Sequence, residues 1–177
     1  LKLKEQIIYK EINSKITSKI NIKKIIHSEK QFNYRNHARF SIRRNGQIGF
    51  TNKVTKKFAA INHCLIMNNK INKYINNLEN LVGETSQLSI RASENTNSFL
   101  IQPKFQNSDI KIETGQKYYD EQISGYKFQI SSPSFFQVNS NQIENMKNTI
   151  LSLIKDNRKG LLVDAYSGVG TFGILLS

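Results

Sequence analysis

The sequence has very little cysteine, few acidic residues and no long apolar run, and each shortage excludes a class of protein. Of its 177 residues a single one, Cys64, is cysteine, so a framework of internal disulfides is excluded. No stretch of eighteen apolar residues occurs, and no secretory signal peptide is visible at the start. We therefore expect a cytoplasmic protein that does not associate with membranes.

The sequence also has no internal repeat and no linker rich in proline or glycine. Its hydrophobic content of 38%, with 10% aromatic residues, is enough to build a core, which excludes a disordered protein. The length allows one domain, or one small domain and part of another.

Positive charge is concentrated in the first third of the chain. Residues 1–60 hold 15 Lys or Arg and three Asp or Glu, a net charge of +12, whereas residues 61–177 are nearly balanced at +1. Such a segment is typical of proteins that bind nucleic acid. A composition rich in Lys, Asn and Ile could account for the lysines alone, but it accounts poorly for the arginines, which are Arg35, Arg39, Arg43 and Arg44.

Residues 1 to about 20 are predicted to form an amphipathic helix, because isoleucines recur every four residues among lysines. These are Ile8, Ile12, Ile16 and Ile20. The pattern is already under way at the first residue, so we expect the helix to begin before the chain does and the chain to be truncated at this end.

The segment from Asn33 to Phe50 is predicted to form a β-hairpin. Apolar and polar side chains alternate from Ala38 to Arg43, and the dipeptide Asn45-Gly46 is a strong turn signal between two such strands. The polar face carries Arg39 and Arg43, which could grip phosphates or could simply face water. Both interpretations remain open at this point.

The remaining elements complete a small antiparallel α+β domain and lead into a second one. We predict strands at 57–61, 87–91, 99–102 and 110–113, and a helix from about 65 to 81 whose inner stripe is Ile66, Ile71, Ile75 and Leu78. A further strand at 126–130 precedes a helix from about 140 to 154, with a cap-like Asn139 and an inner face of Ile143, Met146, Ile150 and Ile154.

The last stretch, GLLVDAYSGVGTFGILLS from Gly160, is predicted to be the first strand-turn-helix unit of a doubly wound domain. Leu161–Val163 has the continuous apolar character of a buried parallel strand. The glycines at 168, 170 and 173 then allow a tight turn and a close approach of a ligand before a helix that begins at about Thr171.

The ligand of this turn is not fixed by its glycines. Their spacing fits the dinucleotide fingerprint, but Asp164 precedes the first glycine, whereas a dinucleotide site carries its acidic residue about twenty residues later. A carboxylate at this place suits a ligand with positive charge, and S-adenosylmethionine is one. A turn without a ligand and a nicotinamide-dependent oxidoreductase are the alternatives.

Three blocks together resemble the RNA (uracil-5-)-methyltransferase family, and in particular its 23S rRNA uridine-C5 enzymes. They are YRNHARFSIR…GQIGF (34–50) followed by INHCLI (61–66), SPSFFQVN (132–139) and DAYSGVGTFGILLS (164–177). The resemblance implies an α+β central RNA-contacting domain (1–125) and the start of a Rossmann-like class I S-adenosylmethionine-dependent methyltransferase domain (126–177). It implies methylation of uridine C5 in RNA, ribosomal RNA rather than transfer RNA, by a monomer.

Site residues follow from the resemblance position by position. Cofactor-binding roles fall on Gln137, Asp164, Tyr166, Gly168, Gly170 and Thr171, and RNA-binding roles on Arg35, Arg39, Arg43 and Arg44. Asp164 could instead only cap the next helix. Phe135 and Phe136 fit the core as well as they fit a ligand.

Cys64 matches the fourth ligand of a [4Fe–4S] cluster in many members of the family. A cluster needs four ligands, so Cys64 alone holds none, and the alternative is a small buried apolar side chain. The cysteine that attacks uracil C6 and the general base follow the cofactor loop in the family, so we expect the isolated chain to be an inactive fragment. A non-catalytic basic RNA-binding module is the second hypothesis.

Overall fold

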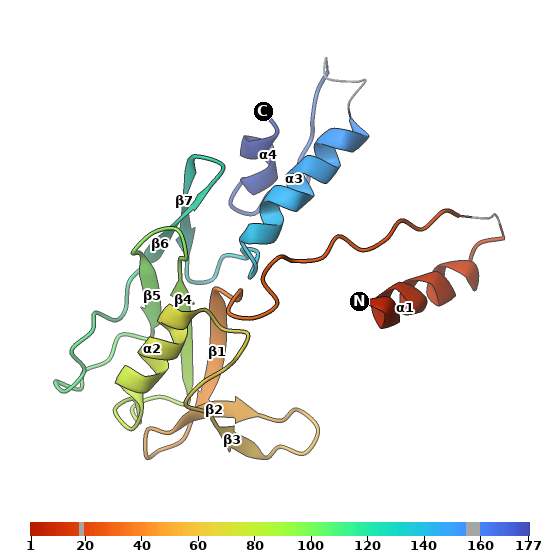
Figure 1. Ribbon diagram of the computed structural model, residues 1–177. Coiled ribbons are helices and arrows are strands. Elements are labelled where there is room, and N and C mark those ends of the chain that lie inside the picture. The colour runs from red at the N-terminus through yellow and green to blue at the C-terminus, as the bar shows by residue number, and fades with distance from the viewer. Residues whose placement is uncertain (18–19, 155–159) are drawn as a thin grey trace.

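A computed structural model describes residues 1–17, 20–154 and 160–177 (Figure 1). The helices are α1 (Lys2–Asn13), α2 (Asn69–Leu78), α3 (Asn141–Leu153) and α4 (Thr171–Leu175). The strands are β1 (His37–Ile42), β2 (Ile48–Thr51), β3 (Phe58–Ala60), β4 (Gln87–Ala92), β5 (Phe99–Gln102), β6 (Tyr118–Ile123) and β7 (Tyr126–Ser131).

The predicted hairpin is confirmed and forms the middle of a five-stranded sheet. The strand order is β3-β2-β1-β4-β5, and each neighbouring pair is antiparallel. The turn between β1 and β2 places Gly46 at a φ of +82°. A Cβ there would lie 2.5 Å from the carbonyl carbon of Asn80, so only glycine fits.

Helix α2 covers one face of this sheet and closes the first core (Figure 1). Its start is fixed by Asn68, whose side chain accepts a hydrogen bond from the backbone N of Ile71 at 2.9 Å. The predicted stripe holds for Ile71, Ile75 and Leu78, which are fully buried against the sheet. Ile66 lies before the helix and is only half-buried.

The predicted strand at 110–113 is wrong, because the backbone of β5 at Ile101 bonds to residues 115 and 116 instead. The backbone N of Ile101 donates to Oε1 of Gln116 at 3.0 Å, and that of Gly115 donates to the carbonyl of Ile101 at 2.7 Å. Ile110 and Ile112 pack against the first core from this loop.

A two-stranded sheet, β6-β7, stands beside the first and was predicted only in part. Strand β7 matches the expected strand at 126–130, but β6 was missed because its sequence, YYDEQI, buries Glu121 among apolar side chains. The turn at Ser124 and Gly125, with φ values of 50° and 84°, is the signal that could have found it.

A second core joins this hairpin to α3 and α4. It consists of Leu100, Tyr119, Ile123, Phe128, Ile130, Phe136, Ile143 and Leu175. Of the predicted inner face of α3 only Ile143 is buried, whereas Met146 is 39% exposed. Ser140, not Asn139, is the N-cap residue of α3.

The predicted parallel strand Leu161–Val163 is absent, and this correction has a simple cause. A strand needs a hydrogen-bonded neighbour, and among the described residues these three pair with none. They are therefore exposed, Leu161 to 92% and Val163 to 72%. The helix after the turn forms as predicted, from Thr171.

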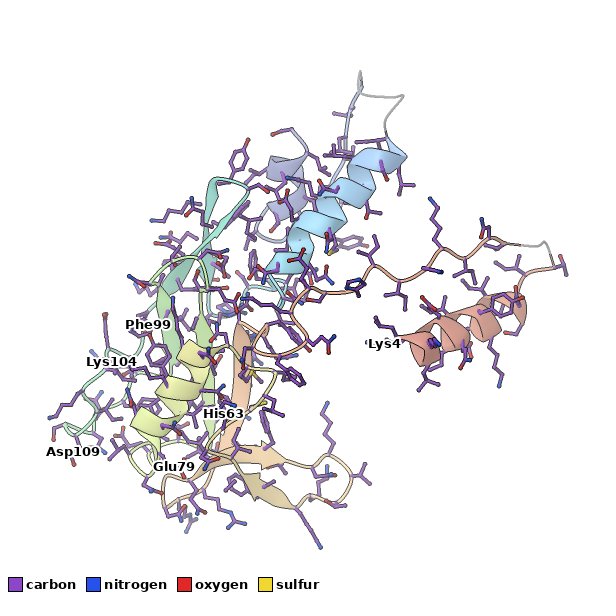
Figure 2. All side chains as sticks on the ribbon, viewed as in Figure 1. Lys4, His63, Glu79, Phe99, Lys104 and Asp109 are labelled. Carbon is purple, nitrogen blue, oxygen red and sulfur yellow. The ribbon has the colours of Figure 1, made fainter. Side chains whose placement is uncertain are left out.

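Helix α1 is shorter than predicted and lies apart from the two sheets, as Figure 2 shows, where Lys4 is the labelled residue of this helix. It ends at Asn13 and has no buried residue; Ile7 and Ile8 are exposed, and Ile12 is half-buried. One side-chain bond ties it to the connecting segment, from the backbone N of Ile25 to Oε1 of Glu5 at 2.9 Å. Within the described ranges, no helix is both long and apolar enough to cross a membrane.

Candidate functional site

The glycine-rich turn and the SPSFFQVN segment lie next to each other. Gly168 and Gly170 both have positive φ, 55° and 77°, and Gly170 is the N-cap residue of α4. A Cβ at Gly168 would lie 4.0 Å from the carbonyl oxygen of Phe135, with no closer neighbour outside the turn. The backbone of the turn is therefore open to a ligand beside the segment that carries Gln137.

The other predicted cofactor residues of the turn differ in exposure. Tyr166 is 99% exposed and Asp164 is exposed, so both side chains are accessible. Thr171 is only 8% exposed, so its side chain belongs largely to the packing of α4. Asp164 makes no capping hydrogen bond to α4, and Oδ2 of this residue would lie 3.9 Å from a Cβ at Gly173.

The two phenylalanines of the segment have different surroundings. Phe136 is 3% exposed and packs on Phe128, with ring centroids 6.5 Å apart, so the core interpretation is correct for it. Phe135 is 74% exposed. Gln137 is half-buried, and its side-chain amide makes no hydrogen bond to any described residue, so both of its polar atoms remain available.

The central sheet holds this segment through two buried polar residues that sequence reasoning missed. Asn36 donates from its backbone N to the carbonyl of Val138 at 2.8 Å and from Nδ2 to the carbonyl of Gln137 at 3.1 Å. Arg91 of β4 donates from Nη2 to the carbonyl of Ser134 at 2.6 Å. In the alternating strand QLSIRA, Arg91 occupies a polar position, so the sequence carried no distinct sign of this role.

Basic side chains of β1 and β4 lie on the sheet face opposite α2, and of these Arg39 is exposed. In the register of β1 and β4, His37 lies opposite Arg91 and Arg39 lies opposite Ser89, so these four side chains share a face. Burial, then the guanidinium groups of Arg91, Arg39 and Arg35, lower the pKa of His37 to about 4. His37 is therefore neutral at pH 7, and because Arg91 is buried, the exposed positive charge of β1 and β4 on this face is that of Arg39.

The four predicted RNA-binding arginines do not form one cluster. Arg35 precedes β1, and Arg43 and Arg44 follow it, so roughly 26 Å of extended chain separates Arg35 from Arg43. Arg35 is partly engaged, because its Nε donates to the carbonyl of His37 at 2.9 Å. Arg43 lies over the ring of Phe58, 4.5 Å from its centroid, and Arg39 is exposed.

Cys64 lies at the edge of the first core. It is half-buried, its backbone N donates to Oδ1 of Asn72 at 2.9 Å, and Nδ2 of Asn72 donates back to its carbonyl at 3.2 Å. Among residues 1–17, 20–154 and 160–177, no group of three His, Cys, Asp or Glu side chains could hold a metal ion. These hydrogen bonds use only the backbone of Cys64, and its half-buried side chain packs against the first core, which decides neither interpretation of the residue.

Comparison with known sequences finds RNA methyltransferases. An uncharacterised RNA methyltransferase of Prochlorococcus marinus is 27% identical over 202 residues, covering 82% of this chain, and one of Fusobacterium nucleatum is 29% identical over 94% of it. A tRNA (uracil(54)-C(5))-methyltransferase of Pyrococcus furiosus is 39% identical over 69 residues, 39% of this chain. The match spans 48%, 35% and 16% of these relatives, so the chain corresponds to about half of their length at most. No protein-family model matches the chain.

Comparison of structures finds the same fold. The tRNA (uracil-54, C5)-methyltransferase of Pyrococcus abyssi, solved in complex with S-adenosyl-L-homocysteine, superposes with a TM-score of 0.67 at 23% identity. The superposition covers 86% of this chain and 48% of that one. The fold is thus an antiparallel α+β domain followed by part of a methyltransferase domain. The chain is therefore similar in sequence to RNA methyltransferases, among them a tRNA (uracil(54)-C(5))-methyltransferase, and it shares the fold of another such enzyme.

Proposed function

We propose that this chain supplies the RNA-contacting part and the start of the cofactor-binding part of an enzyme that methylates C5 of uridine in RNA with S-adenosylmethionine. The central domain is residues 1–125 and the methyltransferase part is residues 126–177. The observation that carries the proposal is the proximity of the glycine turn to the Phe135–Gln137 segment, since a Cβ at Gly168 would lie 4.0 Å from the carbonyl oxygen of Phe135, near a sheet face that carries Arg39.

The residues of this chain suit the cofactor in charge and in hydrogen-bonding capacity. The left-handed glycines leave the backbone of the turn open, and the exposed carboxylate of Asp164 suits the positive sulfonium and amino groups. Gln137 offers one donor and one acceptor, Tyr166 offers an exposed ring, and Gly168, Gly170 and Thr171 form the turn. When bound, S-adenosylmethionine supplies an activated methyl group on its sulfonium.

The basic face supplies the RNA contact in this proposal. Arg35 and Arg39 lie near His37 at the start of β1, next to Asn36, which donates to the carbonyl of Gln137. An RNA phosphate bound there would therefore lie close to the cofactor residues. Arg43 and Arg44 would extend the contact along the strand. The attacking cysteine and the general base are assigned by family resemblance to residues outside this chain, so we expect no methyl transfer by residues 1–177 alone.

The RNA class is the finer part of the proposal. Cys64 matches a cluster ligand of the ribosomal RNA enzymes, so we propose 23S ribosomal RNA as the substrate and a [4Fe–4S] cluster in the full-length protein. Two relatives, from Pyrococcus furiosus and Danio rerio, are named as tRNA uracil methyltransferases. The cytoplasmic location and the monomeric state also remain predictions.

The experiment is a methyl-transfer assay on the protein produced from its full reading frame. Tritiated S-adenosylmethionine is incubated with unmodified 23S ribosomal RNA and, separately, with unmodified tRNA. We expect label on uridine C5 in the ribosomal RNA. Label in tRNA alone would overturn the choice of RNA but not the reaction, and salt-sensitive RNA binding without label would favour the non-catalytic RNA-binding module.

Gln137→Ala tests the cofactor site more directly. Loss of a hydrogen bond worth about 1 kcal/mol should weaken binding of S-adenosylhomocysteine about fivefold by calorimetry. The melting temperature should stay unchanged, because the amide bonds no described residue. The matched control is Gln129→Ala, an exposed glutamine of β7, which should leave binding unaltered. Equal affinity in both variants would contradict a role for Gln137.

A further inference from the structure

The Gln137 segment is held at both ends by the central sheet. Before Gln137, the carbonyls of Ser134 and Ser132 accept hydrogen bonds from Nη2 of Arg91, at 2.6 and 3.4 Å. After it, the carbonyl of Val138 accepts from the backbone N of Asn36. None of these bonds involves the Gln137 side chain. They therefore fix the backbone position of Gln137 and leave its side-chain amide free.

Arg91 has few other interactions that would explain its burial. It is 2% exposed, and burial of a guanidinium is costly unless its donors are used. In the part of the chain that the structure describes, Nε and Nη1 of Arg91 have no hydrogen-bond partner, and no carboxylate forms an ion pair with it. Its side-chain hydrogen bonds go to the carbonyls of Ser132 and Ser134, and its guanidinium lies over the ring of Tyr119.

Asn36 is itself fixed to the same strand as Arg91. It is fully buried, and its carbonyl accepts from the backbone N of Ala92, the neighbour of Arg91, at 3.0 Å. From that position its side chain donates to the carbonyl of Gln137 at 3.1 Å and to Oγ of Ser140, the N-cap residue of α3, at 3.4 Å. The end of β4 thus serves as a common anchor for the whole stretch from Ser132 to Ser140.

We propose that Arg91 and Asn36 are positioning residues for the cofactor site, which they serve by holding the backbone around Gln137 in its binding position. The proposal rests on the proposed function, in which Gln137 binds the cofactor. It assigns to the central domain a second task besides contact with RNA, namely to set the geometry of the methyltransferase part. Charge-assisted hydrogen bonds of the kind that Arg91 makes are the stronger class, so Arg91 should matter more than Asn36.

The test is a double-mutant cycle on the protein from its full reading frame, read as the dissociation constant of S-adenosylhomocysteine. Arg91→Met replaces the arginine with an apolar side chain of similar length and removes both hydrogen bonds. We expect S-adenosylhomocysteine to bind about tenfold more weakly to this variant. Arg91→Lys keeps a charged donor and should recover about half of the loss on a logarithmic scale. Because Arg91 acts through Gln137, the double variant Arg91→Met/Gln137→Ala should bind about as weakly as Arg91→Met alone, not fiftyfold weaker.

The control separates positioning from stability. Asn72→Ala removes a buried side chain of the same domain that bonds Cys64 and Met67, so it should lower the melting temperature without changing the affinity. If Arg91→Met fails to fold, Asn36→Ala takes its place in the cycle, with an expected threefold loss.

The contrary outcomes are distinct. Wild-type affinity in Arg91→Met, or a double variant in which the two losses multiply, overturns the positioning role and leaves the proposed function intact. A wild-type protein that does not bind S-adenosylhomocysteine overturns the proposed function and the positioning role together.

Discussion

At the residue scale, the unusual feature of this chain is the set of polar side chains buried where the two cores meet. Glu121 is fully buried and accepts a hydrogen bond from Oγ of Ser93 at 2.7 Å, and burial raises its pKa. His37 is half-buried among arginines, which lower its pKa, after the larger effect of burial. Each of these groups binds its proton differently in the folded and unfolded chain, so each links stability to pH.

His37 should make the protein less stable in acid. Its pKa falls from 6.5 in the unfolded chain to about 4 in the folded one, so the unfolded chain takes up the proton first. The stabilising contribution of neutral His37 is complete above pH 6.5 and is lost as the pH falls toward 4. Over that window the free energy of unfolding should decrease by up to about 1.4 kcal/mol per pH unit.

Urea unfolding of the wild type and His37→Gln at several pH values measures this effect. Glu121 acts in the opposite direction, because its raised pKa makes protonation stabilise the fold as the pH falls. The difference between the two proteins cancels that contribution, and it should change between pH 7 and pH 4.5. A difference that is constant with pH would show that His37 does not titrate abnormally.

At the element scale, the hairpins depend on glycines for two different reasons. Gly46 and Gly125 have φ values of 82° and 84°, and each lies in the turn of a β-hairpin. A Cβ at Gly46 would meet the backbone of Asn80 at 2.5 Å, whereas a Cβ at Gly125 would have nothing within 4 Å. The first glycine is needed for close contact as well as for conformation, and the second for conformation alone.

The substitutions Gly46→Ala and Gly125→Ala therefore form a matched pair. Gly125→Ala should cost about 1–2 kcal/mol, the price of a left-handed alanine. Gly46→Ala should cost more than about 3 kcal/mol, because the turn and the end of α2 must also separate. Denaturant titration gives both values, and equal losses would mean that the loop at Asn80 moves aside freely.

The elements that the sequence predicted are those with a local pattern. The β1–β2 hairpin was predicted from its alternating apolar and polar residues and from the turn dipeptide Asn45-Gly46. Helix α2 was predicted from its apolar stripe. Strand β6 was missed because its buried Glu121 breaks the apolar pattern. Leu161–Val163 has the pattern of a buried strand and yet is exposed, since burial needs neighbours that no local pattern supplies.

The candidate site was predictable to the same degree. The motifs around Gln137 and Gly168 could be identified along the sequence, and the structure places their backbones side by side. What the sequence could not supply is the support from Arg91 and Asn36, because contacts between residues 36, 91 and 134–138 span distant parts of the chain. The division at residues 125 and 126 falls in the turn of the β6–β7 hairpin, and it stays a prediction.

At the scale of the whole molecule, the uneven charge is the property that bears most on function. The net charge is +13, almost all of it in residues 1–60, where Arg39 lies in β1 and Arg43 directly follows it. Charges farther from a bound phosphate than about 10 Å are largely screened at 0.1 M salt. RNA affinity should therefore depend on where the positive charges lie and not only on their number.

The double variant Arg39→Gln/Arg43→Gln tests this dependence against a control of equal charge. Lys104→Gln/Lys111→Gln also removes two positive charges, but from the loop after β5, where Figure 2 shows Lys104 and Asp109. For single-stranded RNA, the slope of log affinity against log salt should fall by about 0.7 per lost phosphate contact, or about 1.4 for the arginine pair, and stay constant for the lysine pair. Equal effects of both pairs would mean that RNA responds to net charge alone, in which case the arginines are a solvated face. An effect of the lysine pair alone would move the RNA surface to the β5–β6 loop.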